Sequence, residues 1–402
     1  MRMYTQNLKN YLDLYWNDSN AFIIADCYEF SMVTGEVFHF TNMQVPSMAE
    51  VPGGRITTSG ATAAGSSVVN VNTSSLPGTL NRILGNGGQY VIDLTNPSVI
   101  PPGTRVSSYD TDLNLTLTMS GDATGAGIAA GDTLSFQNYY VVGPRFSRTK
   151  TKTQVGPQID EMEVDLLVTD TDTITINNTS NITWQEASYF GLFDGGYCKL
   201  SRAFFTTFPG NPSLLGTCQG SVVWFYGRIS DIVIGRTKVS IKVKSLIDLI
   251  TIQMPRRLYQ ASCGWIFGAP GCDYNRVLGQ NALGTSTGIG QVGITCLTGS
   301  NQNTILTSFN PSPSTIYNNG TMISTSGQNN GYTRTIGLLA VNSGTGLGQI
   351  FYLKPWLFPV TPGVDTFNLL PGCDHTLATC QAFQNQDRYG GFPYIPPPET
   401  AV

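Results

Sequence analysis

Charged side chains are scarce in this chain of 402 residues. Only 12% of the residues are Asp, Glu, Lys or Arg, about half the usual share. The net charge of −4 gives no positive field that would draw the protein to nucleic acid. Glycine is abundant, with 44 residues. This composition argues against a solvated helical protein, favours short strands joined by turns, and suits a surface that neighbouring subunits cover.

Histidine is also scarce, because His39 and His375 are the only two. A Ser-His-Asp or Cys-His catalytic arrangement would have to use one of them. Neither lies in the sequence context of a nucleophile elbow. His39 falls in the aromatic run EVFHF, which is typical of a structural histidine on a strand. Hydrolase chemistry built on histidine is therefore not expected, and no catalytic residue is predicted.

Long apolar runs are absent. The N-terminal residues lack the apolar core of a signal peptide, and no run is long enough to span a bilayer. We therefore expect no membrane anchor and a protein made in a cytoplasm, where structural disulfides are disfavoured. Eight cysteines are too few for a disulfide framework, so some of them need another role.

Alternating patterns predict strands along most of the chain. Residues 20–42 predict two strands around a turn at Thr34 and Gly35. Residues 161–166 and 238–244 alternate apolar and charged side chains, which indicates strands with one buried face. No stretch keeps a helical period, so the predicted class is all-β.

Composition divides the chain into three predicted domains. A β-rich domain is formed by residues 1–47 plus 137–250. A small inserted β-domain spans residues 48–136 and begins with a Gly/Ser/Thr-rich exposed loop. A C-terminal domain covers residues 251–402, with a β-rich interior at about 281–355. Residues 245–253 predict either a short helix or a last strand, and the final prolines predict an extended tail.

A basic run, RFSRTKTKT, contains Arg145, Arg148, Lys150 and Lys152. These side chains could contact phosphate. The run lacks the interleaved aromatic residues of a platform for single-stranded nucleic acid. We interpret it as the solvated face of a strand or as a subunit contact.

Two cysteine pairs lie about a hundred residues apart. Eight residues separate Cys263 from Cys272, and six separate Cys373 from Cys380. Four thiolates from two loops can bind zinc or an iron–sulfur cluster. These spacings are wider than those of most zinc knuckles, and the bulky run at 265–267 better suits a larger cluster screened from water. Four buried thiols without a metal remain the alternative on spacing alone.

The residues around these pairs carry a family resemblance. The strings CGWIFGAPGCDYNR and GCDHTLATCQAFQNQDRYGGFPYIP resemble the C-terminal domain of phage baseplate hub or tail-tip proteins. That family includes relatives of the lambda-type minor tail protein L and the hubs of gene transfer agents. The resemblance is strongest over residues 255–396 and nearly absent in the insertion. The matching positions of the second string are Gly372, Cys373, Asp374, Thr379, Cys380, Phe383, Asn385, Tyr389, Gly391, Phe392, Pro393 and Pro396.

The resemblance implies a fold, a cofactor and a set of partners. It implies β-barrel-like hub domains and a C-terminal [4Fe–4S] domain whose ligands are Cys263, Cys272, Cys373 and Cys380, with zinc as the alternative metal. It also implies a homotrimeric hub in the virion, at the tip of a long-tailed phage tail assembled in the host cytoplasm. Its expected partners are the distal tail protein, the central tip or fibre protein and the C-terminus of the tape-measure protein. DNA would pass through the lumen during ejection without sequence-specific binding.

Two other functions stay open at this point. One is an enzyme, either an iron–sulfur redox protein or a tail enzyme that degrades the cell envelope. The sequence contains no Gly-rich nucleotide-binding fingerprint that a redox enzyme would use. The other is a host-binding adhesin built on the inserted β-domain.

Overall fold

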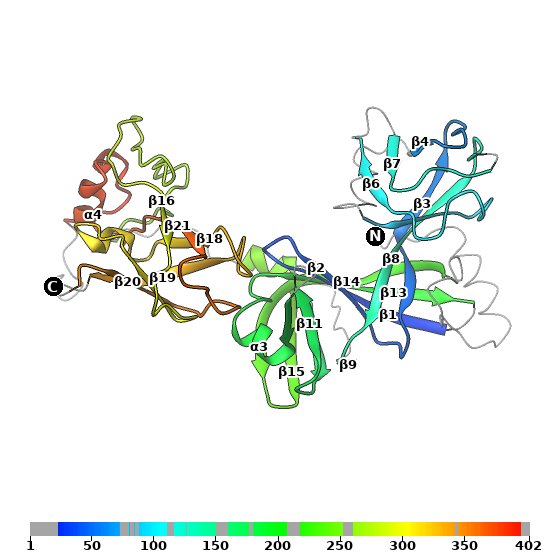
Figure 1. Cartoon of the computed structure of the whole chain (residues 1–402), viewed down its shortest axis with the longest axis horizontal. Helices are drawn as coiled ribbons and strands as arrows, with labels where there is room; N and C mark the ends of the chain where they lie inside the picture. Colours follow the sequence, from blue (N-terminus) through cyan, green and yellow to red (C-terminus); the bar gives the residue numbers. More distant parts are fainter. Residues whose placement is uncertain are drawn as a thin grey trace. The chain divides into compact units, whose positions relative to one another are not determined.

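The computed structural model describes residues 23–72, 80, 84, 88–110, 116–125, 127–149, 160–176, 180–206, 218–251, 260–341 and 345–394. The chain divides into two compact units. The first unit contains residues 1–172 and 193–248, and the second contains residues 173–192 and 249–402. Both consist of strands, as Figure 1 shows, so the predicted all-β class is confirmed. Among the described helices, none is long and apolar enough to cross a membrane. The predicted domain boundaries remain a prediction.

The first unit holds one sheet of thirteen strands, in the order β6-β7-β4-β3-β8-β2-β1-β13-β14-β15-β10-β9, with β5 paired to β8. The strands are β1 (Ile23–Ser31), β2 (Val37–Thr41), β3 (Ser47–Thr58), β4 (Val68–Asn72), β5 (Tyr90–Asp93), β6 (Val106–Tyr109), β7 (Thr116–Met119), β8 (Thr133–Val142), β9 (Arg145–Arg148), β10 (Glu161–Leu167), β13 (Tyr197–Phe205), β14 (Cys218–Ile234) and β15 (Lys238–Ser245). The short helix η1 (Leu246–Thr251) follows β15, which confirms the helical alternative for this segment.

The predicted strand patterns are confirmed where the sequence alternates. β1 and β2 form a hairpin, and Gly35 in its turn has a φ of 91°, a conformation that glycine adopts without strain. Residues Met162, Val164 and Leu166 of β10 are buried, while their neighbours on the strand are half-buried or exposed. The inward positions of β15 are buried in the same way.

The predicted exposed loop after Met48 is wrong. Residues 47–58 form β3, the longest strand in this part of the chain, and most of its first five side chains are deeply buried. The alternation is hidden because the pairing with β8 shifts between Glu50 and Arg55. Gly53 in this bulge has a φ of 76°, and Gly54 lies so close to the Val51 and Phe136 carbonyls that it leaves no room for a Cβ. The glycines therefore serve the bulge of a strand.

The sheet curls so that strands distant in its order come together. At one side, Arg55 Nη2 of β3 donates to the Gln219 carbonyl of β14 at 3.3 Å, and the Ser221 hydroxyl donates to the Glu50 carbonyl. At the other side, β9 returns to β1. Arg148 Nε donates to Asp26 Oδ2 at 2.8 Å, and no sheet pairing links these two strands. The central strands are thereby covered on both faces, as in a barrel.

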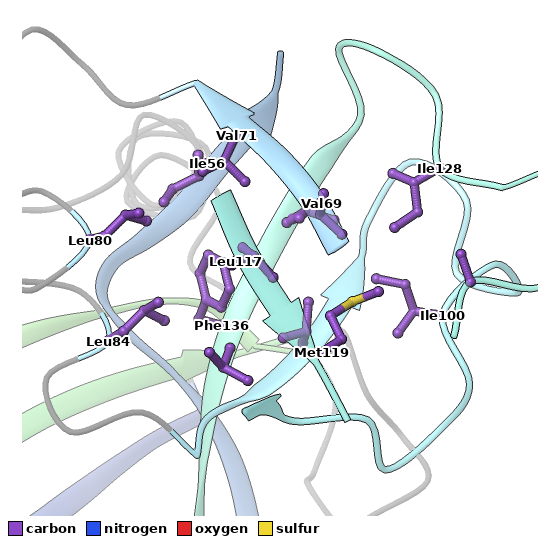
Figure 2. Packing of buried hydrophobic residues seen from close by; sticks show 14 of the residues in the cluster. Ile56, Val69, Val71, Leu80, Leu84, Ile100, Leu117, Met119, Ile128 and Phe136 are labelled. Carbon is purple, nitrogen blue, oxygen red and sulfur yellow. The ribbon is translucent and has the colours of Figure 1, made fainter. Parts of the chain in front are cut away.

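Burial along β1 demonstrates this double cover, since the four consecutive residues Ala25 to Tyr28 are all buried. Ala25 and Cys27 belong to a cluster on one face. On the other face, the ring of Tyr28 stacks on that of Phe146 with centroids 4.8 Å apart. A second core fills the part of the unit built by β3 to β8, where apolar side chains from facing strands meet (Figure 2). It contains Ile56, Val69, Val71, Leu80, Leu84, Val91, Val99, Ile100, Val106, Leu117, Met119, Ala123, Ile128, Leu134 and Phe136.

The second unit contains a six-stranded sheet in the order β16-β21-β18-β19-β20-β17. Just beyond β16, Leu297 N donates to the Leu306 carbonyl of β17 at 2.8 Å, so the two ends of this order meet and the sheet closes. The elements are β11 (Thr173–Ile176), β12 (Ser180–Thr183), α3 (Trp184–Tyr189), β16 (Val292–Thr295), β17 (Thr304–Thr307), η2 (Ser314–Tyr317), β18 (Thr321–Ser324), β19 (Thr333–Val341), β20 (Gly348–Tyr352), β21 (Thr366–Leu370), α4 (Leu377–Ala382) and η3 (Gln386–Arg388).

Arg334 of β19 ties the segment 173–192 to this closed sheet. Its Nη2 donates to the Phe190 carbonyl at 2.9 Å, just beyond α3, and its Nε donates to the Pro355 carbonyl at 2.7 Å. The guanidinium lies over the Trp356 ring at 5.5 Å. A planar side chain with several donors is suited to such a junction.

The first prediction concerns Glu29 of β1. Its carboxylate accepts from Lys199 Nζ at 2.7 Å and lies 3.6 Å from His39 Nε2, its neighbours on the two adjacent strands. Burial raises the pKa of Glu29, but His39 and Lys199 outweigh it and lower the pKa to about 2. The ionised carboxylate therefore stabilises the fold above the pKa of about 4.3 in the unfolded chain, and this stability is lost as the pH falls through about 2.

We expect Glu29→Gln to remove this contribution, which is on the order of 3 kcal/mol between pH 5 and pH 2. Denaturant unfolding at several pH values measures it. If the unfolding free energies of the variant and the natural protein changed equally with pH, Glu29 would not make this contribution. Asp231→Asn is the control, because that side chain is 61% exposed and its pair with Lys242 spans 4.0 Å.

Candidate metal centre

The two cysteine segments, residues 260–290 and 371–394, meet because the strands beside them pair. β16 follows the first segment and β21 precedes the second, and the two strands run antiparallel with Val292 opposite Leu369. The chain therefore leaves the closed sheet next to the point where it entered. Arg276 fastens the junction, since its Nε donates to the Pro371 carbonyl at 3.0 Å and its Nη2 to Thr321 Oγ1 at 3.0 Å.

All four predicted cysteines line one small pocket, which we call the thiol pocket. Cys272 is buried and the other three are half-buried. The remaining cysteines, at positions 27, 198, 218 and 296, are buried elsewhere, as predicted for core thiols. The walls of the thiol pocket include Trp265, Phe267 and Phe383. Phe267, Tyr274 and Phe383 pack together with centroids 4.7–5.2 Å apart, so an aromatic cluster seals one side.

Each sulfur also has a hydrogen-bond partner. His375 N donates to Cys373 Sγ at 3.3 Å, and Gly390 N donates to Cys263 Sγ at 3.3 Å. The Asn385 amide lies 3.6 Å from Cys272 Sγ, and Cys380 Sγ donates to the Asn385 carbonyl at 3.2 Å. Three of the sulfurs, those of Cys263, Cys272 and Cys373, thus face N–H donors, the arrangement that stabilises a thiolate ligand, whereas Cys380 is the donor in its own bond.

Two of the thiols, those of Cys373 and Cys380, stay protonated without a cation. Burial, followed by its three cysteine neighbours, raises the pKa of Cys380 to about 12. The pKa of Cys373 is raised as well, chiefly by burial. A metal ion or cluster would reverse this, because coordination deprotonates a thiol outright. Over the described residues, no group of three or more His, Cys, Asp or Glu side chains has the geometry to hold a metal ion. The fit to a metal therefore rests on the shared pocket, the four sulfurs and the N–H donors to three of them.

The backbone of both segments is strained near the cysteines. Four residues other than glycine have a positive φ in the described part of the chain, and three of them are Asp273, His375 and Gln384. Each lies within four positions of a cysteine. Such conformations cost energy and cluster at functional sites. Cys380 lies on α4, where the Thr376 hydroxyl accepts from Thr379 N at 3.3 Å and caps the helix. The sequence had predicted only a compact loop at this position.

Trp265 is clamped between the two segments. Its ring lies against Gly271 of the first segment and Gly390 of the second so closely that a Cβ at either glycine would overlap it. Neither glycine had a role in the sequence-based predictions. What indicates this contact in the sequence is a bulky aromatic residue that occurs together with two glycines beside the cysteines.

We expect Gly390→Ala to displace the indole and to destabilise the second unit by about 1–3 kcal/mol, the usual cost of overpacking. Thermal unfolding and tryptophan fluorescence check this. The control is Gly264→Ala, because a Cβ there meets no atom within 4 Å. Equal stability of the two variants would refute the clamp.

Comparisons with known proteins agree with this architecture. Residues 111–275 match the family described as baseplate hub protein, N-terminal attachment domain. Residues 315–399 match the family described as phage conserved hypothetical protein BR0599. None of the curated proteins matches the chain.

One similar solved structure is a chain from the virion of a native gene transfer agent particle. The identity is 13% and the TM-score 0.54, and the match covers 97% of this chain and 94% of the other. The likeness concerns the fold over nearly the whole length of both chains. The chain is thus similar to baseplate hub proteins over residues 111–275, to the BR0599 family over residues 315–399, and in its overall fold to a chain of a gene transfer agent virion.

Proposed function

We propose that the protein is the hub at the tip of a long-tailed phage tail. In this role a homotrimer joins the ring of distal tail protein to the central tip or fibre protein. The C-terminus of the tape-measure protein and the DNA pass through its lumen during ejection, without sequence-specific contacts. The observation that carries the proposal is the match of residues 111–275 to a baseplate hub attachment domain.

The physical character of the first unit supports a role in a rigid assembly. Its central strands are covered on both faces, and Asp26 forms ion pairs with Arg148 across the curl and with Arg202 on the adjacent strand. Both guanidiniums reach the same carboxylate, with Nε to oxygen distances of 2.8 and 3.0 Å. Packed interiors of this kind resist deformation and transmit strain. The proposed role needs no catalytic residue.

We further propose that the thiol pocket binds a [4Fe–4S] cluster through Cys263, Cys272, Cys373 and Cys380, with zinc as the alternative. Four sulfurs in one pocket that no carboxylate lines are the donor set of iron–sulfur clusters and of structural zinc. Aromatic walls and N–H donors to sulfur fit a cluster that must be screened from water. When bound, the group would add two ligand bonds from each of two segments that already share a small apolar cluster and several hydrogen bonds.

Replacing one ligand tests the metal centre. We expect Cys373→Ser to remove most of the iron and the visible absorption, to lower the unfolding temperature of the second unit, and to yield non-infectious particles. Metal analysis, absorption spectra and plaque assays measure these effects. Cys296→Ser is the matched control, because Cys296 is buried in the same unit outside the pocket and donates to the Thr361 carbonyl at 3.1 Å, as a serine can.

The identity of the bound metal distinguishes an iron–sulfur cluster from a zinc site. Zinc in place of iron would overturn the cluster and keep the metal centre. Infectious particles with no bound metal would overturn both.

An exposed aliphatic loop beside the pocket suits contact with another tail component. Val277, Leu278 and Leu283 are 54%, 62% and 79% exposed. The loop is held in shape by side-chain amides: Asn275 Oδ1 accepts from two backbone N–H groups at 3.1 and 3.0 Å, and Asn281 Oδ1 does the same at 3.0 and 2.9 Å. A preformed apolar surface loses little entropy on binding.

We expect Leu283→Asp to leave stability within about 0.5 kcal/mol, as surface changes usually do, but to reduce incorporation of the protein into tails. Quantitative immunoblots of purified particles measure incorporation. Val364→Asp, at a side chain 64% exposed in the same unit, controls for the added charge. Normal incorporation of Leu283→Asp would exclude this loop from the interface.

A further inference from the structure

Asn385 lies between one cysteine of each segment. Its side chain is buried, with 4% of the residue exposed. The amide Nδ2 donates to the Cys272 carbonyl at 2.8 Å and lies 3.6 Å from Cys272 Sγ. Its backbone carbonyl accepts from Cys380 Sγ at 3.2 Å, and its backbone N–H donates to the Cys380 carbonyl at 3.0 Å. One residue thus contacts a cysteine from the first segment and a cysteine from the second.

The orientation of the Asn385 amide is fixed by its surroundings. Its Oδ1 accepts from Ala282 N at 3.1 Å, so this end of the amide must be the oxygen. The opposite end, the NH₂ group, therefore faces Cys272. Nδ2 has two hydrogens, which is enough for both the carbonyl and the sulfur of that residue.

The backbone immediately before Asn385 is also fixed, by a hydrogen bond from another side chain. Gln384 has a φ of 51°, a strained conformation for a residue with a side chain. Asn281 Nδ2 donates to the Gln384 carbonyl at 2.9 Å and fixes this turn. Asn281 is itself buried, with 7% exposed, and its side-chain amide bonds to the backbone groups of Gln384, Leu283 and Thr285 rather than to a sulfur. The two asparagines differ in that Asn385 alone reaches a sulfur.

We propose that Asn385 is a positioning residue of the metal centre, which sets the place of Cys272 and Cys380 and donates an N–H···S bond that raises the reduction potential of the bound group. This inference rests on the proposed iron–sulfur centre. A hydrogen bond to a thiolate is charge-assisted, and it withdraws electron density from the sulfur. Hydrogen bonds to the sulfurs are among the factors that set the potential of a cluster.

An isosteric substitution tests the proposal in the full-length protein. Asn385→Asp keeps an acceptor for Ala282 N, but it places a carboxylate oxygen against the Cys272 carbonyl and sulfur in place of the NH₂ group. We expect a more negative reduction potential by spectroelectrochemical titration. We also expect iron to be lost to a chelator roughly 10–100 times more readily, the usual effect of removing an outer partner of a metal ligand.

Asn329→Asp is the matched control. Asn329 is buried in the same unit, with 1% exposed, and its amide pairs with the Phe358 carbonyl and N–H at 2.8 and 2.9 Å. It does not line the thiol pocket, so this variant makes the same chemical change and should keep the natural potential even where stability falls. Asn385→Ser serves where the buried carboxylate of Asn385→Asp prevents folding. It removes the donor without adding charge, and it should shift the potential in the same direction by a smaller amount.

The outcomes separate this inference from the proposed function. Natural protein that holds neither iron nor zinc would overturn the metal centre itself, and zinc in place of iron would overturn the effect on the reduction potential. Iron-loaded Asn385→Asp or Asn385→Ser with the natural potential and chelator resistance would overturn the role of Asn385 and leave the centre intact. An equal shift of potential in Asn329→Asp would show a general effect of buried charge in the fold and would also overturn it.

Discussion

The pairing of β16 with β21 is the constraint on which the candidate centre depends. In chain order, β16 is the first strand of the closed sheet in the second unit and β21 is the last. In the sheet, the two strands are antiparallel neighbours. The chain between them, about seventy residues, therefore returns to its starting point. Folding of the sheet already includes the loss of entropy from closing this segment into a loop. The two cysteine segments are therefore brought together without a further loss of loop-closure entropy. A cluster or ion that binds there fastens a junction that the sheet has already formed.

The same principle organises the first unit, where sheet curvature brings distant strands together. Asp26 of β1 receives Arg148 from the far end of the sheet order and Arg202 from the adjacent strand. This outcome differs from the sequence-based interpretation of the basic run as a solvated strand face or subunit contact. Arg145 does lie exposed, but Arg148 is half-buried and paired within the chain. Lys150 and Lys152 lie outside the described residues.

The sequence predicted those features that a short window can encode. Alternation located β10 and β15, a Thr-Gly turn located the first hairpin, and spacing with apolar neighbours selected four of eight cysteines, which line one pocket. Their role as metal ligands stays a prediction. The window failed at β3, because a bulge with Gly53 and Gly54 broke the alternation. It also gave no sign that residues 173–192 belong to the second unit, since that depends on a bond from Arg334 more than 140 residues away.

Long-range contacts also explain why the residues around the thiol pocket were harder to predict than the cysteines. The chemistry of a cysteine can be inferred from its residue type. The roles of Asn385 and Gly390 depend on a partner in the other segment, which a sequence pattern does not show. Both contacts need the β16–β21 pairing to exist. If the metal centre only linked the two segments mechanically, any tight packing around the sulfurs would be enough for that link. A directed amide donor would then add nothing. The fixed orientation of Asn385 therefore supports the proposal that the electronic state of a group bound there would matter, as well as its presence.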